Sequence, residues 1–472
     1  MTPQDPFQHL SFECAGTILF YLNPTDIAKC EQVSKGWKDF IHAWITLYGF
    51  RLNFSTSSDP SMPDSKDPTT IVRRFKELAA IEQNLLLGRA TAVRKIEASE
   101  NIQFAGDYAV WRRGGEIHWQ RLSFKADGSL YASKWLPSAS PVFGSRYFVN
   151  EEGYFVLQRV GKAGRVDVFS LEDAARLYSL NEPRLRGHEL VALGRERIYF
   201  ATPDRRCMLT VLDLKNGQHL YSAVLGEGVP EAGLPWWRIS ICRRAFTLLR
   251  ASGHGERELL LVLEAIPNPG TLKVIDGRNG NIAQEIRTDA SRDAYVAMAP
   301  GQEEFAVVSH DNRKRIHIWR FSAGSDGLFY EQAIKIINHV NGTSPHLERR
   351  AFDPFRYLIA SFDGRAVPSI QAVSPSALQA DGISGGLNPE SGASTDKGAQ
   401  QGGRRELTLP PRQAHHRARR PFVPDENYTP IEMRFLDGNR LVYRTGPRSS
   451  RGPDVNVLFD FGLRVRELKR SR

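Results

Sequence analysis

The sequence has few cysteines and no long apolar run. Its four cysteines, Cys14, Cys30, Cys207 and Cys242, form no CxxC pair and no closely spaced framework, so we expect no disulfide scaffold. No stretch of about 18 apolar residues occurs, which argues against a membrane-spanning helix. The first ten residues carry no basic segment followed by an apolar one, so we expect no secretory signal. These absences predict a reducing compartment, cytoplasmic and/or nuclear.

Catalytic motifs are also missing. The sequence contains no HExxH, no GxSxG and no P-loop. Two adjacent histidines occur in HHRARR (415–420), but no cysteine or carboxylate stands at metal-ligand spacing from them. We therefore predict no catalytic residues, no metal and no cofactor, and a protein that is not an enzyme.

What the sequence does have is an excess of basic residues. The formal net charge is +10, and HHRARR together with RVRELKRSR (464–472) contributes part of it. Such segments act as solubilising tails, as nuclear-import signals or as contacts to nucleic acid. The spacing does not decide between these roles.

The first fifty residues predict three short amphipathic helices. Ala15, Ile18, Leu19 and Leu22 fall at i, i+3, i+4 and i+7, which places them on one helical stripe. Asn23 and Ser34 are candidate caps of the second and third helices. A three-helix unit of about forty residues has a small core, which suggests that it docks on a partner.

This segment, over about residues 7–45, resembles the F-box. The family pattern is Leu-Pro-x-Glu, Ile-Leu-x-x-Leu, Asp-Pro-x-Asp-Leu and Val-x-Lys-x-Trp. The spacing matches without a gap, although Ser11, Cys14, Ala15 and Gly16 depart from the usual residues. The matching positions are Leu10, Glu13, Ile18, Leu19, Leu22, then Asn23-Pro24-Thr25-Asp26-Ile27, then Val33-Ser34-Lys35-Gly36-Trp37.

The resemblance implies binding of a Skp-family adaptor and, through it, a cullin. The alternative is a generic three-helix cap without an adaptor. Apolar side chains would lose water against the adaptor's helices, whereas Trp37 is expected in the unit's own core. The implied adaptor-binding residues are Leu10, Phe12, Ile18, Leu19, Pro24, Ile27 and Val33.

A linker follows. Residues 55–69 are rich in Ser, Pro and Asp and predict a loop. Thr69 or Thr70 would cap a helix that starts near Ile71. The segment 81–88 resembles the junction Asn-Trp-x-x-Gly that precedes WD-type propellers in F-box proteins, with Leu85 at the Trp position. A helix here would hold the two domains at a fixed distance.

From about residue 100 a strand-like unit recurs. It consists of an alternating strand, a polar turn and a second strand, and Asn216-Gly217 and Asn279-Gly280 are strong hairpin signals. Equivalent strand residues follow one another in steps of 49, 43, 63, 44 and 139, and a four-stranded propeller blade takes about 40–50. The equivalent residues are Trp119, Val168, Val211, Val274, Ile318 and Val457.

The longest step leaves room for one more blade, around 356–370, and for an insert at 374–420 whose composition predicts disorder. We predict a multidomain chain: a small all-α F-box, a helical linker and an all-β propeller of about seven blades. The unit lacks the Gly-His and Trp-Asp marks and resembles the degenerate WD-like propellers of fungal F-box proteins. A double sandwich is the alternative. The predicted divisions are 1–50 F-box, 51–98 linker, 99–373 propeller, 374–420 insert, and 421–472 last blade with a basic tail.

The expected function is that of a substrate receptor in an SCF-type cullin ubiquitin ligase, with the propeller binding an unknown protein, acidic or phosphorylated. The alternative is a scaffold acting outside ubiquitination, or one binding nucleic acid through basic segments. We expect no membrane partner and do not favour nucleic acid. Arginine pairs suit phosphate, but surface pairing explains Arg184/Arg186 and Arg349/Arg350 equally, and Trp236 and Trp237 suit a core or an anchor. The candidate target-binding residues are Arg205, Arg206, Trp236, Trp237, Arg243 and Arg244.

Overall fold

The computed structural model describes a helical unit and a ring of sheets. The described residues are 10–54, 67–86, 90–96, 100–113, 115–123, 125, 131–136, 145–159, 164–202, 207–225, 244–251, 257–264, 270–288, 294–298, 304–310, 316–337, 352–355, 358–362, 368–372, 376–377, 404–406, 428–435, 440–447 and 455–462.

The N-terminal helical unit forms because each of its first three helices has a side-chain cap. Ser11 accepts a hydrogen bond from the Cys14 N–H, and Asn23 and Ser34 cap the next two helices as predicted. The proline usual in the family at Ser11 is therefore replaced by a capping hydroxyl. The elements are α1 (Phe12–Phe20), α2 (Pro24–Cys30), α3 (Lys35–Trp44), a π-helical turn (Ile45–Gly49) and α4 (Phe50–Phe54).

Trp44 forms the centre of this unit's core and explains two glycines. The indole is 3% exposed. A Cβ on Gly16 would lie 3.0 Å from Trp44 Nε1, and a Cβ on Gly49 would lie 2.2 Å from Trp44 Cζ3. Gly16, which costs about 1 kcal/mol by helix propensity, is thus the residue that leaves room for the tryptophan.

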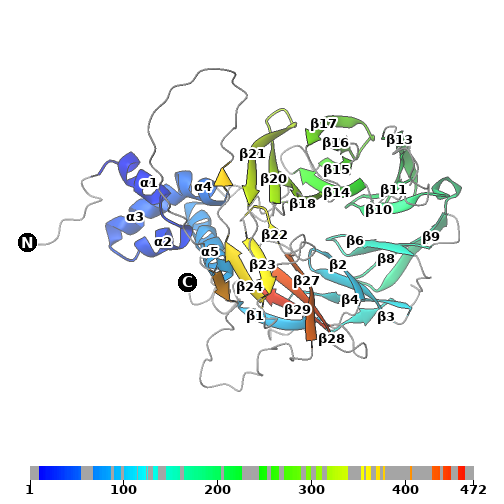
Figure 1. Ribbon diagram of the computed structural model, residues 1–472, viewed down its shortest axis with the longest axis horizontal. Coiled ribbons are helices and arrows are strands. Elements are labelled where there is room, and N and C mark those ends of the chain that lie inside the picture. The colour runs from blue at the N-terminus through cyan, green and yellow to red at the C-terminus, as the bar shows by residue number, and fades with distance from the viewer. Residues whose placement is uncertain are drawn as a thin grey trace, which may run out of the picture.

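Helix α5 (Pro68–Leu86) joins the helical unit to the ring. Its cap is Asp67, whose carboxylate accepts hydrogen bonds from the Thr69 and Thr70 N–H groups. The prediction that Thr69 or Thr70 is the cap was therefore wrong, because an ionised carboxylate is the stronger acceptor at this end of a helix. Figure 1 shows α1–α3 on the far side of α5 from the strands, and α5 contacts α2 and β24 (Pro368–Ala372).

The remaining strands in the described residues form seven antiparallel sheets, arranged as a β-propeller with N-terminal helices (Figure 1). The first three are β2 (Glu100–Ala105), β3 (Tyr108–Arg113), β4 (Glu116–Arg121) and β5 (Lys134–Trp135); β6 (Arg146–Val149), β7 (Tyr154–Gln158), β8 (Arg165–Ser170) and β9 (Ala175–Asn181); and β10 (Glu189–Leu193), β11 (Arg197–Ala201), β12 (Met208–Asp213) and β13 (His219–Val224).

The other sheets continue in chain order. They are β14 (Arg244–Ala251), β15 (Arg257–Glu264), β16 (Gly270–Asp276) and β17 (Ile282–Thr288); β18 (Tyr295–Met298), β19 (Glu304–His310), β20 (Ile316–Ala323), β21 (Phe329–Ile337) and β25 (Ser376–Ala377); β22 (Phe352–Asp353), β23 (Leu358–Phe362), β24 and β26 (Arg404–Glu406); and β27 (Tyr428–Phe435), β28 (Arg440–Pro447), β29 (Val455–Asp460) and β1 (Ala92–Ile96).

The repeat found in the sequence is the third strand of each sheet. Its six equivalent residues lie on β4, β8, β12, β16, β20 and β29. The glycines of both Asn-Gly turns have positive φ, 72° at Gly217 and 77° at Gly280. Six sheets have described side chains on their inner strands. The sheet that contains β23 and β24, where an additional blade was predicted, is described mainly through its backbone pairing.

The ring closes by pairing the two ends of the chain. β1 pairs antiparallel with β29 over five residue pairs, Ala92↔Asp460 to Ile96↔Asn456. Thr91 adds hydrogen bonds from its N–H and its hydroxyl to the Asp460 carbonyl. Residues 92–96 therefore belong to the propeller and not to the linker in which they were predicted. The last sheet thus combines one strand from near the start of the propeller with three strands from the end of the chain.

Most of the insert predicted at 374–420 lies outside the described residues. Two short strands within it are described: β25 pairs with β21, and β26 pairs with β24. Disorder is thus wrong for residues 376–377 and 404–406, which find backbone partners on sheet edges. Composition alone gave no signal for these two pairings.

Candidate functional site

The helical unit carries an unusual number of exposed large apolar side chains. Tyr21 is 81% exposed, and five others are between 39% and 63% exposed. Single exposed apolar residues are ordinary, but several on one unit of about 45 residues make that unit a candidate for an interaction surface. We call this set the helical surface; it consists of Leu10, Ile18, Tyr21, Val33, Leu47 and Tyr48.

The predicted adaptor-binding residues divide into three groups. Leu10, Ile18 and Val33 belong to the helical surface. Phe12 and Pro24 are half-buried. Leu19 and Ile27 are 0% exposed.

The two buried residues therefore serve the unit's own core, where they pack with Ile41, Trp44 and Phe75. Sequence spacing placed Ile18 and Leu19 on one stripe, but only Leu19 faces inward. The inward face of a nine-residue helix is set by the helices packed against it, and these are not visible in its own periodicity.

Sequence reasoning missed Tyr21, Leu47 and Tyr48. Tyr21 lies outside the apolar stripe of α1. The sequence signal that could have identified it is an aromatic residue at a position where the helix is otherwise polar. Leu47 and Tyr48 lie on the π-helical turn, where the 3.6-residue period no longer holds. The Tyr48 ring lies 6.3 Å from that of Phe12 and the Phe12 ring 5.0 Å from that of Phe40, so this turn lies against the start of α1.

Two polar contacts join the helical unit to α5, and a third, within the unit, shares the Glu31 carboxylate. Glu31 receives hydrogen bonds from Lys76 at 2.5 Å and from His42 at 3.1 Å. The Thr25 hydroxyl donates to the Ala79 carbonyl at 3.1 Å. Desolvation raises the pKa of Glu31, but the hydrogen bonds from Lys76 and His42 outweigh it and hold that pKa below its usual value.

At its other end, α5 is tied to the propeller. Asn84 Nδ2 donates to the Phe461 carbonyl at 3.4 Å. The Thr91 hydroxyl also bonds the Gly462 carbonyl at 2.5 Å. A helix of this length spans about 28 Å, so it acts as a spacer anchored at both ends.

The predicted target-binding residues are hardly visible in the structure. Arg205, Arg206, Trp236, Trp237 and Arg243 lie outside the described residues. Arg244 begins β14, and only its backbone is described. Among the other pairs, Arg349 and Arg350 also lie outside the described part, whereas Arg184 and Arg186 are exposed beside the short helix Pro183–Leu185. Among these residues, the described part of the chain places the side chains of Arg184 and Arg186 alone.

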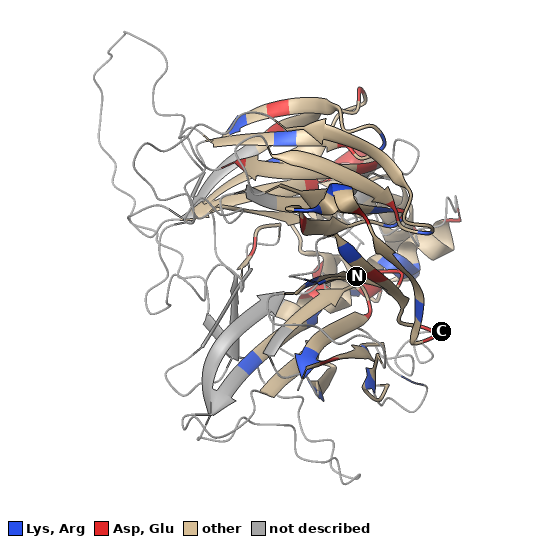
Figure 2. Cartoon of the chain, turned by 90° about the vertical axis from the view of Figure 1, so that its right-hand side faces the viewer, with Lys and Arg blue, Asp and Glu red and all other residues tan. Residues whose placement is uncertain are grey.

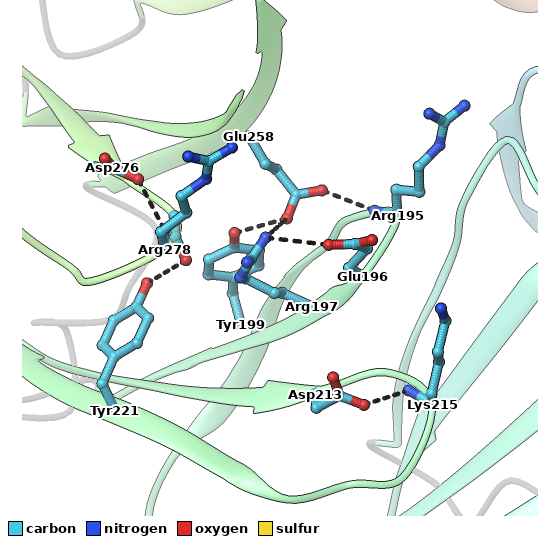
Figure 3. Close-up of polar contacts among 11 residues, drawn as sticks. Arg195, Glu196, Arg197, Tyr199, Asp213, Lys215, Tyr221, Glu258, Asp276 and Arg278 are labelled. Atoms are coloured by element: carbon cyan, nitrogen blue, oxygen red, sulfur yellow. Dashed lines mark hydrogen bonds and ion pairs between the residues drawn. The ribbon is translucent and has the colours of Figure 1, made fainter. Parts of the chain in front are cut away.

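The densest polar cluster lies between two propeller sheets (Figure 3). Glu258 of β15 is 6% exposed and reaches across to the neighbouring sheet. It accepts hydrogen bonds from the Tyr199 hydroxyl at 2.8 Å and from the Arg195 N–H at 2.7 Å. The Arg197 guanidinium lies 3.8 Å from the same carboxylate.

This cluster is a joint between blades. Desolvation raises the pKa of Tyr199, and the Glu258 charge raises it further, so the phenol stays protonated and donates. A Cβ on Gly194 would lie 2.0 Å from the Glu258 carboxylate, so that side chain fills its space completely. Two other tyrosines make similar contacts between sheets. The Tyr221 hydroxyl donates to the Gly277 carbonyl of the next sheet at 2.9 Å, and the Tyr178 hydroxyl donates to the Leu214 carbonyl one sheet earlier.

Charge is mixed over the propeller. Figure 2 shows basic and acidic residues interspersed along its strands.

Within the described part of the chain, no group of three or more His, Cys, Asp or Glu residues could hold a metal ion. None of the described helices is long and apolar enough to cross a membrane. Of the described cysteines, Cys14 is exposed, Cys30 half-buried and Cys207 buried, and none of the three forms a disulfide.

No protein-family model matches this sequence. No curated protein matches it either.

Solved structures show a weak likeness only. The β-propeller domain of Cps50 (Swd1) from Myceliophteria thermophila has 13% identity and a TM-score of 0.40, over 78% of this chain and 98% of that one. A chain of a mitotic checkpoint complex has 12% identity and a TM-score of 0.40, over 79% and 92%. BamB from Moraxella catarrhalis has 11% identity and a TM-score of 0.38, over 78% and 99%. We base no argument on likenesses of this size. The strand pairing itself shows a β-propeller preceded by a helical unit.

Proposed function

We propose that this chain is the substrate-receptor subunit of an SCF-type cullin ubiquitin ligase. In this proposal the helical unit is an F-box that binds a Skp-family adaptor, and the propeller binds the target protein. The observation that carries the proposal is the helical surface: a unit whose three capped helices match the F-box pattern by their spacing exposes six large apolar side chains on and beside its helices. Exposure of this kind is unfavourable unless a partner covers it.

The contribution of these side chains can be estimated. Fully burying one Val, Leu or Ile side chain is worth about 1.5–3 kcal/mol. Ile18 and Val33 are 46% and 63% exposed, so covering them contributes about 1 to 2 kcal/mol each. A charged substitution at either residue adds a desolvation cost in the complex.

The receptor would catalyse nothing itself. It would raise the concentration of a bound target near the ubiquitin donor. The anchored helix α5 supports this role, because a spacer fixed at both ends keeps the target at a constant distance from the adaptor. The chemistry of the target, acidic or phosphorylated, stays a prediction.

The test uses the full-length protein and a purified Skp-family adaptor, with affinity measured by calorimetry. Wild type should bind, and Ile18→Asp with Val33→Asp should weaken binding at least 100-fold. Both residues are exposed, so the fold should survive the substitutions. Leu177→Asp is the matched control, because Leu177 is 47% exposed on β9 in the propeller. Absence of wild-type binding at micromolar concentrations would refute the proposal.

A second candidate is a scaffold that binds the adaptor but works outside ubiquitination. It uses the same helical surface, so the adaptor measurement cannot separate the two. Co-purification with a cullin can: the receptor should bring the cullin with it through the adaptor, and the scaffold should not. Nucleic-acid binding through the basic segments 415–420 and 464–472 concerns residues outside those described.

A further inference from the structure

The outer rim of the β2–β5 sheet combines exposed aromatic rings with basic residues. Trp135, on the edge strand β5, is 50% exposed, and Tyr131 just before it is 40% exposed. Exposure of a tryptophan leaves a large apolar face in water. Lys134, Arg121 and Lys125 are exposed around these rings. We call these five residues the rim patch.

A row of stacked rings leads outward to Trp135. Register pairs Trp111 with His118 and His118 with Trp135, so the three side chains share one face of the sheet. The Trp111 and His118 rings are stacked, with centroids 6.1 Å apart and planes 18° apart. Exposure increases from 1% at Trp111 to 50% at Trp135. The row therefore ends in an open ring at the surface.

Tyr131 provides a second ring. The Gln120 side chain donates to the Tyr131 carbonyl at 2.8 Å, which fixes the backbone there. Tyr131 lies four residues before Trp135, directly ahead of the same edge strand. The Lys125 ammonium and the Arg121 guanidinium lie 5.4 and 5.8 Å from the Tyr131 ring centroid.

The charge around the rings is mainly positive. The nearest described acid on this row, Glu116, lies 3.3 Å from His118 Nε2. Asp107, close to Arg121 on the neighbouring turn, pairs with Arg440 at 3.0 Å. Lys134 lies on the opposite face of β5 from Trp135, with its ammonium 5.1 Å from the Trp119 ring. Glu116 and Asp107 are therefore already engaged by His118 and Arg440.

We infer that the rim patch binds a single-stranded nucleic acid. Bases stack on open aromatic rings without sequence preference, while basic side chains between the rings neutralise the phosphates. Two exposed rings and three exposed cations, gathered at one edge of the sheet, supply both parts. This function goes beyond target binding and adaptor binding, and it uses the folded propeller rather than the basic segments of the chain.

The experiment measures fluorescence anisotropy of a labelled 15-nucleotide oligo(dT) and oligo(U) with the full-length protein at several salt concentrations. Wild type should bind, and the affinity should fall with salt with a slope of about −2, as expected for three phosphate contacts. Trp135→Ala should weaken binding about 5- to 150-fold, the loss of one stacked base. Tyr131→Ala, as an independent variant, should weaken it by a similar factor.

Charge variants give the matched comparison. Arg121→Gln with Lys125→Gln and Lys134→Gln should bring the salt slope close to zero. The control Arg184→Gln with Lys215→Gln and Arg278→Gln removes the same charge from exposed residues elsewhere on the propeller and should leave the slope near −2. Equal losses in the two triple variants would overturn the inference.

Three other results would also overturn it. One is the absence of wild-type oligonucleotide binding at 50 mM salt. Another is binding that disappears when residues 464–472 are deleted but survives Trp135→Ala, which would place the contact on the basic segment. The third is binding to vesicles of anionic phospholipid that depends on Trp135 while oligonucleotides do not bind, which would assign the patch to a membrane surface.

Discussion

Replacing Gly49 by alanine sets two physical effects against each other. Helix propensity favours alanine over glycine by up to about 1 kcal/mol. The structure opposes this, because the added Cβ would lie 2.2 Å from Cζ3 and 2.5 Å from Cε3 of Trp44. Trp44 is almost fully buried and cannot move aside without displacing its neighbours Leu19 and Ile41. Overpacking of this kind typically costs about 1–3 kcal/mol, so we expect Gly49→Ala to destabilise the helical unit.

The assay is hydrogen–deuterium exchange of α1 and α3 in the full-length protein, which reports opening of the helical unit separately from the propeller. A loss of 1–3 kcal/mol should speed exchange there by about 5- to 150-fold. The matched control is Gly36→Ala in α3, since Gly36 is exposed and its replacement should leave exchange unchanged or slower. If Gly49→Ala also slowed exchange, the packing argument for Trp44 would be refuted and propensity would dominate.

Three more predictions concern stability. Tyr199→Phe and Glu258→Gln, combined in a double-mutant cycle measured by urea unfolding, should show a coupling free energy of about 1 kcal/mol or more. The reason is that the two side chains share a buried hydrogen bond to a charged group. Additive effects on the free energy of unfolding would contradict the interpretation that this pair joins two blades. Ile96→Ala should lower the free energy of unfolding by about 2–5 kcal/mol, because Ile96 is 0% exposed where β1 closes the ring. Lys95→Ala, on the same strand but exposed, should change it by less than about 0.5 kcal/mol. Similar losses in both variants would rule out tight packing of β1 at the closure. Hydrogen bonds from Thr69 and Thr70 lower the pKa of Asp67 from 3.8 to about 2; since the folded pKa is the lower one, the cap contributes fully above about pH 3.8 and is lost as the pH falls through 2. An NMR titration of the Asp67 carboxyl group checks this value, and a midpoint near 3.8 would show that the cap does not form.

Local features of this protein were readable from the sequence. Asn23 and Ser34 were predicted as caps and are caps, because capping depends on a side chain and an N–H group three residues away. The third strand of the repeat was located correctly through residues such as Val168 and Val211, because an alternating strand followed by a polar turn recurs at a spacing of one blade. Both Asn-Gly turns were predicted correctly, because tight hairpin turns need residues with positive φ and their glycines have it.

The candidate sites were only partly readable. Three of the seven predicted adaptor-binding residues are exposed, and the most exposed apolar residue of the unit, Tyr21, was not among them. The rim patch was missed because its aromatic residues belong to a two-residue strand without periodicity of its own. Only the strand register, which pairs Trp135 with His118, reveals the row of rings.

The sequence by itself determined the local structure: where helices begin, where strands turn, and which segments form the third strand of the propeller unit. These depend on interactions within a few residues, and each leaves a pattern in the chain. Only the tertiary structure decided that Leu19 is buried while Ile18 is exposed, that Gly16 and Gly49 make room for Trp44, and that β1 completes a sheet with β29. Each of these depends on which distant segments pack together. Contacts between distant segments decide which face of a helix is buried and where a large side chain fits. The residue spacing within one segment does not contain this information.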